Sequence, residues 1–319
     1  MLVYIIFIVS LGVLIYGADL IINQSEKIAL RFGISEYLIG ATLVALGTSL
    51  PEMAASVSAS LNDKPALAIS NIIGSNILNI TLVLGLVLIF ARGGVNPHRD
   101  FFQKDSSWAL FPVLIFIAAI FDSDEINLFK GWAFVALMGA YILFLLRYDK
   151  DTLEIADIDE EEIKKEFNWP KTIALLIVGF VMVVYGADYT VESASQIARS
   201  FGVSEWVVGV ILVALGTSTP ELAVSISAAL KGKADMAIGN IIGSNMANIT
   251  IALGAAAIAN PIKLNFNNYS YDIVTMLIAT LMLVFITANR MYSKPAGISL
   301  LVVLAIFLEH TAKSVGGSS

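Results

Sequence analysis

Two glutamates, Glu52 and Glu221, stand inside apolar stretches of the chain that carry almost no other charge. Each ends a nearly identical decapeptide, "LVALGTSLPE" (43–52) or "LVALGTSTPE" (212–221), in which nine of the ten letters agree. A charged side chain at the midplane of a bilayer costs roughly 2.5–3.5 kcal/mol on insertion scales unless something compensates it. The pattern therefore indicates a compensating positive charge beside each glutamate.

A proline precedes each glutamate, and prolines break helices. Pro51 and Pro220 have no N–H, and their rings clash with the carbonyl four residues earlier. We expect breaks that free carbonyl oxygens around 45–48 and 214–217. Within a membrane such backbone is tolerated only where protein or a water-filled cavity receives it. A bound cation would take the carbonyls and the carboxylate together, so we interpret the break and the charge as two parts of one cation site.

Further oxygen donors recur at helical spacing around the glutamates. Thr48 and Ser49 lie four and three residues before Glu52, while Ser75 and Asn79 are four apart, so each set can share a helix face. The second copy supplies the equivalent residues Thr217, Ser218, Glu221, Ser244 and Asn248. Carboxylate, hydroxyl, amide and carbonyl oxygens suit Ca²⁺ or Na⁺. Two or more Na⁺, or protons, would neutralise two acids as well as one Ca²⁺, so competition at one site would give exchange.

The composition places these residues in an integral membrane protein. Of 319 residues, 57% are hydrophobic and 14% charged, whereas soluble domains average about 45–50% and about 25%. With no cysteine and only two histidines, thiolate sites and most catalytic or zinc constellations are excluded. A membrane-spanning helix needs about 20 apolar residues. Ten candidate spans lie near 2–22, 36–61, 66–90, 107–121, 127–146, 172–191, 203–230, 236–258, 272–288 and 297–309.

The chain is duplicated. After a shift of 169 residues, 32–52 and 201–221 agree at 14 of 21 positions, and "NIIGSNILNIT" (71–81) meets "NIIGSNMANIT" (240–250). We predict an all-α fold with a first half at 1–146, an acidic linker at 147–171 and a second half at 172–319. Five spans per half is an odd number, so the second half enters the membrane from the opposite side. The halves are then inverted repeats, with broken second and seventh helices, as is common in secondary transporters.

The basic residues predict the orientation in the cell membrane. With the N-terminus outside, the inner loops hold 14 Lys and Arg and the outer segments hold 5. Positive residues favour the cytoplasmic side, so we expect both termini outside and the linker in the cytoplasm. The expected partners are inorganic cations and the lipid bilayer, without nucleic acid, and we expect a monomer.

At these motifs the sequence resembles the Ca²⁺/cation antiporter superfamily, in its sodium/calcium exchanger branch of prokaryotic type. The resemblance rests on "ALGTSLPE" (45–52) with "GSNILNI" (74–80), and on "ALGTSTPE" (214–221) with "GSNMANI" (243–249). It covers nearly the whole chain. It implies ten helices, inverted repeats, and alternating access in which the first and sixth helices slide past the rest. It also implies that several Na⁺ ions would move against one Ca²⁺.

The same resemblance implies roles for particular residues. Glu52 and Glu221 would be shared ion ligands, assisted by the backbone oxygens of Thr48 and Thr217. The Na⁺ sites would be completed by Ser49, Ser75, Ser218, Ser244 and the carbonyls of Ala45 and Ala214.

Two positions depart from the family pattern. Many exchangers of this branch carry an aspartate where this chain has Asn248, so the site holds two acids instead of three. Thr219 stands at the position equivalent to Leu50. The proton-coupled branch typically has "GNxxE" in place of "GTSxPE", which favours sodium here.

Other interpretations remain open. A Gly-Thr-Ser run in one helix is usually packing, but its duplication beside a buried acid weighs against that interpretation. Asn71 and Asn240 fit backbone support better than ion binding, and Asp19 and Asp188 fit interfacial or paired carboxylates. Rival functions are an H⁺/Ca²⁺ antiporter that protonates the same glutamates and, more remotely, a cation channel with a glutamate ring. We expect no enzyme activity and no cofactor, because no H-E-x-x-H motif or midplane aspartate pair is present.

Overall fold

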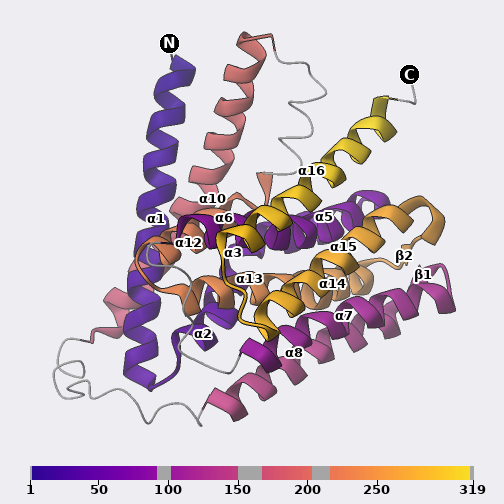
Figure 1. The fold of residues 1–319 in the computed structure, drawn as a ribbon, viewed down its shortest axis with the longest axis horizontal. Coiled ribbons are helices and arrows are strands. Elements are labelled where there is room, and N and C mark those ends of the chain that lie inside the picture. The colour runs from indigo at the N-terminus through magenta and orange to yellow at the C-terminus, as the bar shows by residue number, and fades with distance from the viewer. Residues whose placement is uncertain (1, 92–101, 150–166, 203–215, 317–319) are drawn as a thin grey trace.

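The computed structural model describes residues 2–91, 102–149, 167–202 and 216–316. Helices dominate these ranges (Figure 1). In the first half they are α1 (Leu2–Phe32), α2 (Glu36–Ile39), η1 (Gly40–Val44), α3 (Ala45–Thr48), α4 (Leu50–Leu61), α5 (Pro65–Leu78), η2 (Asn79–Leu84), α6 (Gly85–Phe90), α7 (Phe102–Asp122) and α8 (Leu128–Asp149). In the second half they are α10 (Trp169–Ser200), α12 (Thr219–Leu230), α13 (Ala234–Ala247), η4 (Asn248–Ala252), α14 (Leu253–Ala259), α15 (Phe266–Ala288) and α16 (Lys294–Gly316). The η segments are π-helical.

The apolar helices coincide with the predicted spans wherever the structure describes them. Within the described ranges, seven helical segments are long and apolar enough to cross a membrane, with Pro65–Phe90 (α5 to α6) and Ala234–Ala259 (α13 to α14) each counted as one. The pair Glu36–Thr48 and Leu50–Leu61, bent by 45°, makes an eighth if it is taken as one broken span. A shorter apolar helix, Ser107–Phe121, matches the predicted fourth span. The beginning of the predicted seventh span, 203–215, lies outside the described residues, as does most of the linker. The chain is therefore a multi-pass membrane protein, and the count of ten remains a prediction.

One small element departs from the all-α prediction. Strands β1 (Glu125–Ile126) and β2 (Ile262–Lys263) pair antiparallel, with Glu125 opposite Lys263. Next to the pair, the Leu264 N–H donates to the Asp124 carbonyl at 2.9 Å. This short ladder joins the α7–α8 connection of the first half to the α14–α15 connection of the second.

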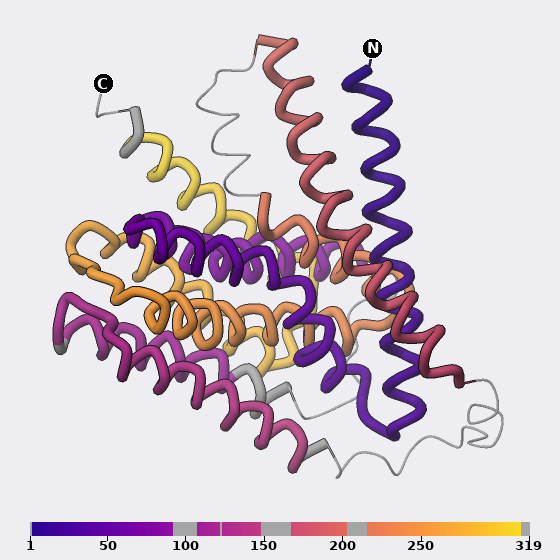
Figure 2. The backbone as a smooth tube through the Cα atoms, turned by 180° about the vertical axis from the view of Figure 1, so that it is seen from behind, coloured from indigo at the N-terminus to yellow at the C-terminus, as the bar shows by residue number. Residues whose placement is uncertain are grey.

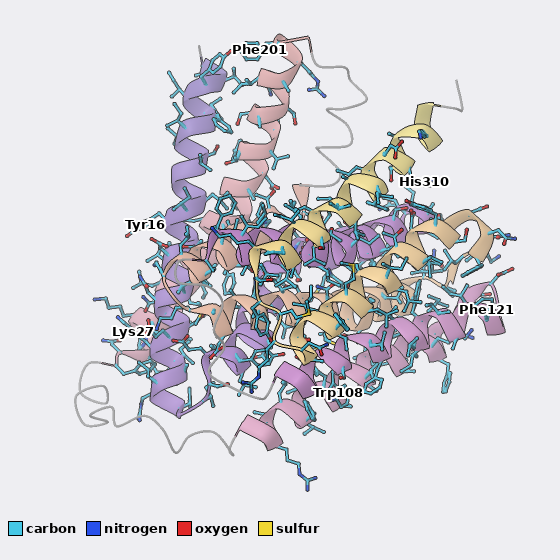
Figure 3. All side chains as sticks on the ribbon, in the orientation of Figure 1. Tyr16, Lys27, Trp108, Phe121, Phe201 and His310 are labelled. Carbon is cyan, nitrogen blue, oxygen red and sulfur yellow. The ribbon has the colours of Figure 1, made fainter. Side chains whose placement is uncertain are left out.

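Apolar side chains cover the outside of the bundle, and polar side chains are enclosed within it. Tyr16 on α1 and Phe121 on α7 are 60% and 69% exposed, and Figure 3 shows both at the margin of the molecule. The side chains of Glu52 and Glu221 are completely buried. This is the arrangement expected of a protein surrounded by lipid, where intramembrane charges face the bundle interior.

The helices α1 and α10 form an antiparallel pair along one side of the molecule (Figures 1 and 2). Glycines let their backbones approach closely, as is usual in membranes. A Cβ on Gly17 would lie 2.8 Å from the Met182 Cβ, and one on Gly186 would lie 2.8 Å from the Leu14 backbone nitrogen. Gly17 and Gly186 are 169 residues apart, so the first helix of each half contributes the same position to the crossing.

Helix α13 lies at the centre of the bundle. Every residue from Met236 to Ala247 is buried. The helix crosses α2 and η1 in close contact, because an ideal Cβ on Gly243 would lie only 2.3 Å from the Ala41 carbonyl oxygen. Only glycine fits at this crossing without movement of the backbone.

We expect Gly243→Ala to destabilise the protein, because overpacking of this kind typically costs about 1–3 kcal/mol. The measurement is thermal unfolding of the purified protein in detergent. Gly139→Ala is the matched control, since no described neighbour lies within 4 Å of a Cβ there, and alanine is the better helix former. Equal melting temperatures of the Gly243 and Gly139 variants would contradict the close crossing.

Ion pairs tie α1 to the turn between α12 and α13. The Lys233 ammonium contacts Glu26 of α1 and lies 2.7 Å from Glu36 at the start of α2. Lys231 lies 2.9 Å from Asp19, which also accepts a 2.6 Å hydrogen bond from Ser227. The prediction that Asp19 is a paired carboxylate is thereby confirmed.

The ion pairs of Lys233 make a pH-dependent contribution to stability. Partial burial disfavours the ammonium, but the hydrogen bonds and charges of Glu26 and Glu36 outweigh it and raise the pKa of Lys233 above its ordinary value. Stabilisation is then complete below the unfolded-state pKa of about 10.4 and is lost as the pH rises through the raised value.

We therefore expect Lys233→Met to lower the stability by about 0.2–1 kcal/mol at pH 8, the range typical of solvent-accessible ion pairs. The difference from wild type should disappear at pH values above the raised pKa. Thermal unfolding across this pH range is the measurement. Lys64→Met is the control, because Lys64 occupies the equivalent turn of the first half and is exposed without an ion pair to any described residue. An equal loss of stability in both variants would refute this role, and so would a loss in Lys233→Met that does not change with pH.

Candidate cation site

Two serines mark the helix breaks beside the glutamates. Ser49 separates α3 from α4 with φ −84° and ψ 5°, and Ser218 precedes α12 with φ −88° and ψ 2°. Pro51 and Pro220 occupy the first turn of the helices that follow, where a missing N–H leaves no intrahelical bond unmade. The breaks thus precede the prolines by two residues, and both halves have the same backbone geometry there.

The carbonyl of Ala45 differs from the sequence prediction. It accepts hydrogen bonds from the Ser49 backbone N–H at 3.0 Å and from the Thr48 hydroxyl at 3.3 Å, so the expectation that it is unpaired is wrong for this structure. The helical turn continues as far as Ser49, which explains the difference. Pro51 provides no N–H for the Gly47 carbonyl. Ala214 lies outside the described residues.

The glutamates lie in the first turns of α4 and α12, where the helix dipole favours negative charge. Oε1 of Glu221 accepts a 2.8 Å hydrogen bond from the Ser49 hydroxyl, which belongs to the other half of the chain. Oε2 of Glu221 and both carboxylate oxygens of Glu52 have no hydrogen-bond partner among the described residues. The two carboxylates are close enough to repel each other. Buried polar groups are normally paired, so these oxygens point to a missing positive partner.

Other predicted ligands gather around the carboxylates. Thr48 and Ser244 lie beside Glu221, and Thr217 lies beside Glu52. The Ser75 and Thr217 hydroxyls are 3.5 Å apart and come from opposite halves. Several further polar atoms of the predicted ligands are buried without a partner among the described residues, namely the hydroxyls of Ser218 and Ser244 and both amide atoms of Asn79 and Asn248.

Asn79 and Asn248 occupy special backbone positions. Each is the first residue of a π-helical segment, η2 or η4, and single π-turns inside helices often accompany functional sites. Both side chains are fully buried. Their equivalence across the 169-residue repeat, with the same unpaired amide atoms, supports a place for both in the site.

Sequence reasoning missed two serines at the edge of the site. The Asn71 side chain donates to the Ser56 hydroxyl, and the Asn240 side chain donates to the Ser225 hydroxyl, both at 2.9 Å. The available signal was their spacing, because 56 and 225 also differ by 169 and each serine follows its glutamate by four residues. The prediction that Asn71 supports the backbone is consistent with its 3.2 Å hydrogen bond to the Glu52 backbone carbonyl, whereas the partners of the Asn240 carboxamide are side chains.

The assembled donors are two carboxylates with hydroxyl, amide and carbonyl oxygens. In the described ranges, no group of three or more His, Cys, Asp or Glu side chains is placed to hold a metal. The site therefore carries two formal negative charges and otherwise neutral oxygens, which are ligands for hard cations such as Ca²⁺ and Na⁺.

This combination of buried carboxylates, broken helices and repeated halves defines a membrane carrier of cations. The family model described as "Sodium/calcium exchanger protein" matches residues 2–147 and 171–312. The chain belongs to the sodium/calcium exchanger family, a family of transporters.

Several relatives match over nearly their full length. An uncharacterised membrane protein of Methanocaldococcus jannaschii is 34% identical over 302 residues, which is 95% of this chain and 94% of the relative. The sodium/calcium exchanger MaX1 of Methanosarcina acetivorans is 29% identical, with 96% and 97% covered. A structure of the sodium-calcium exchanger NCX_Mj, soaked with Na⁺ and Sr²⁺, superimposes with a TM-score of 0.78 at 32% identity and covers 97% of this chain and 98% of that one.

Proposed function

We propose that this protein is a secondary active antiporter that exchanges Na⁺ for Ca²⁺ at one shared site. The observation that carries the proposal is the pair of fully buried carboxylates, Glu52 and Glu221, with three of their four oxygens unpartnered among the described residues. The Ser49–Glu221 hydrogen bond joins the two halves there. The exchanger family and the NCX_Mj structures soaked with Na⁺ and Sr²⁺ or Ca²⁺ support these ions as the cargo.

The proposed ligand set spans both halves. Glu52 and Glu221 are shared by Ca²⁺ and Na⁺, and neutral oxygens complete the ion shells. The remaining proposed ligands are Thr48, Thr217, Ser49, Ser218, Ser75, Ser244, Asn79, Asn248, Ala45 and Ala214. Ala45 would have to release one of its two hydrogen bonds to bind an ion through its carbonyl.

The mechanism follows from charge neutralisation. One Ca²⁺ cancels the two carboxylate charges, and so do Na⁺ ions, whereas an empty site leaves two buried charges whose burial is costly. A carrier with an empty site would therefore rarely change between its inward-open and outward-open states. Transport then occurs mainly when one kind of ion has replaced the other at the site. We propose that α1 and α10 slide together past the remaining helices. Their close antiparallel contact, in which glycines bring the two backbones together, supports movement of the two helices as one unit.

The proposed topology places the halves as inverted repeats at 1–146 and 172–319, with the linker at 147–171. The antiparallel directions of α1 and α10 support inversion (Figure 2). The bias of basic residues supports outside termini and a cytoplasmic linker.

The main rival is H⁺/Ca²⁺ exchange through protonation of the same glutamates. The proposed ligand set has an amide at the equivalent positions of both halves, Asn79 and Asn248, and so contains no third acid. Glu52 and Glu221 are then the two groups of that set that protons could neutralise. Uptake of ⁴⁵Ca²⁺ into proteoliposomes, with outward Na⁺ and pH gradients imposed separately, distinguishes the two functions. We expect uptake with the Na⁺ gradient. If the Na⁺ gradient drives no uptake while the pH gradient does, sodium coupling is refuted.

We expect Glu52→Gln and Glu221→Gln each to abolish exchange, because an amide keeps the shape of the side chain but removes half of the site's charge. The measurement is the same ⁴⁵Ca²⁺ uptake, with size-exclusion profiles to establish folding. Glu309→Gln is the matched control, since Glu309 is exposed near the end of α16 and pairs with Lys313 one helical turn away. Transport at wild-type rate in either site variant would remove that glutamate from the mechanism.

Ca²⁺ should also stabilise the detergent-solubilised protein against heat, because it binds the folded state alone. At a concentration 100 times the Kd, the gain is about 2.7 kcal/mol. Thermal unfolding with and without Ca²⁺ measures it independently of transport. The Ca²⁺-induced shift in melting temperature should vanish in Glu52→Gln and persist in Glu309→Gln. A shift of wild-type size in Glu52→Gln would show that Ca²⁺ binds elsewhere.

A further inference from the structure

We propose that Asn71 and Asn240 are positioning residues, each of which holds the threonine at the helix break of the opposite half in place for ion binding. The inference rests on the proposed function, because Thr48 and Thr217 matter as cation ligands only if the site binds cations. It concerns two asparagines that the ligand set itself leaves out.

Asn71 bridges the two halves with both polar atoms of its side chain. Its Nδ2 donates to the Glu52 backbone carbonyl at 3.2 Å and to the Ser56 hydroxyl at 2.9 Å, both in α4 of its own half. Its Oδ1 accepts from the Thr217 hydroxyl of the other half at 3.4 Å. One carboxamide therefore sets the distance between the backbone of one glutamate and the threonine of the opposite break.

Asn240 makes the equivalent bridge in the opposite direction. Its Nδ2 donates to the Ser225 hydroxyl at 2.9 Å in α12 of its own half. Its Oδ1 accepts from the Thr48 hydroxyl of the first half at 3.3 Å. All three residues lie 169 positions from their counterparts in the Asn71 bridge, so the asparagine–serine and asparagine–threonine bonds are present in both halves, whereas the bond to the glutamate backbone is found for Asn71 alone among the described residues.

These bonds explain how a helix end can present its carbonyl accurately. Thr48 is the last residue of α3, directly before the break at Ser49. Its side chain and its backbone carbonyl share one Cα, so a hydroxyl held by a hydrogen bond limits displacement of the Cα from which the carbonyl projects. Ligands must be held within about 0.5 Å of productive geometry by supporting contacts, and a helix end has few backbone bonds to provide them.

The contrast with other asparagines separates positioning from ligation. Asn79 and Asn248 are buried with no partner for Oδ1 among the described residues, which leaves that oxygen available to a cation. The carboxamides of Asn71 and Asn240 instead have both Nδ2 and Oδ1 hydrogen-bonded to protein. They are thus the contacts that support the ligands.

A double-mutant cycle tests the proposal. Thr48→Val removes the hydroxyl but keeps the shape and the backbone carbonyl, and Asn240→Ala removes its partner. With the wild type and the double variant they complete the cycle, read as the apparent KM for Ca²⁺ in Na⁺-driven ⁴⁵Ca²⁺ uptake. Each single change should raise KM about five- to tenfold, the loss of roughly one hydrogen bond, with a smaller change in maximal rate. The double variant should match the singles, because coupled residues are not additive.

Two further variants bracket the effect. Thr48→Ser retains the hydroxyl and should recover most of the affinity that Thr48→Val loses. Asn76→Ala removes a buried amide from the helix that carries Asn71. Among the described residues that amide donates to the Ile72 carbonyl of its own helix at 2.8 Å and to no residue of the site, so KM should change less than twofold. If Asn240→Ala does not fold, Ser225→Ala replaces it in the cycle.

The outcomes are distinct. Additive effects of the two changes, or an Asn240→Ala variant with wild-type KM, would overturn the positioning role. Absence of Na⁺-driven uptake by the wild type would instead refute the proposed function. The cycle would then be read from the Ca²⁺-induced thermal shift, where the same non-additivity is expected.

Discussion

The structure depends on two carboxylates buried where lipid surrounds the protein. Glu52 and Glu221 are fully enclosed, and most of their oxygens lack a partner among the described residues. Their charge can be tolerated there only with cations or protons present. The broken helices, the collected hydroxyl and amide oxygens, and the placement of both acids at helix N-termini all reduce that cost without removing it. This residual cost links the fold to transport.

The duplicated sequence produces duplicated local geometry but not identical contacts. The breaks at Ser49 and Ser218 have nearly the same φ and ψ, and Asn79 and Asn248 both begin π-helical segments. Yet Ser49 donates to the glutamate of the opposite half, while the hydroxyl of Ser218 has no partner in the described part of the chain. Sequence equivalence therefore determines the backbone more strictly than it determines the bonds made across the site.

Much of this could be predicted from the sequence, for physical reasons. Apolar length predicted the spans, and the duplicated acids predicted where polar residues collect. Pro51 predicted a break but not its position at Ser49, because proline also fits the first turn of a helix. Ser56 and Ser225 escaped notice because a helical serine usually bonds its own backbone. The β1–β2 pair was missed because a two-residue strand carries no alternating pattern.

That small β ladder has a mechanical consequence. It joins the α7–α8 connection to the α14–α15 connection, and its paired residues Ile126 and Ile262 have completely buried side chains. Separation of the two connections would break the β1–β2 hydrogen bonds and expose both isoleucines. The two halves are thus linked at the edge of the molecule far from α1 and α10 (Figure 1), and a movement that separates the halves at that edge would have to break these backbone hydrogen bonds.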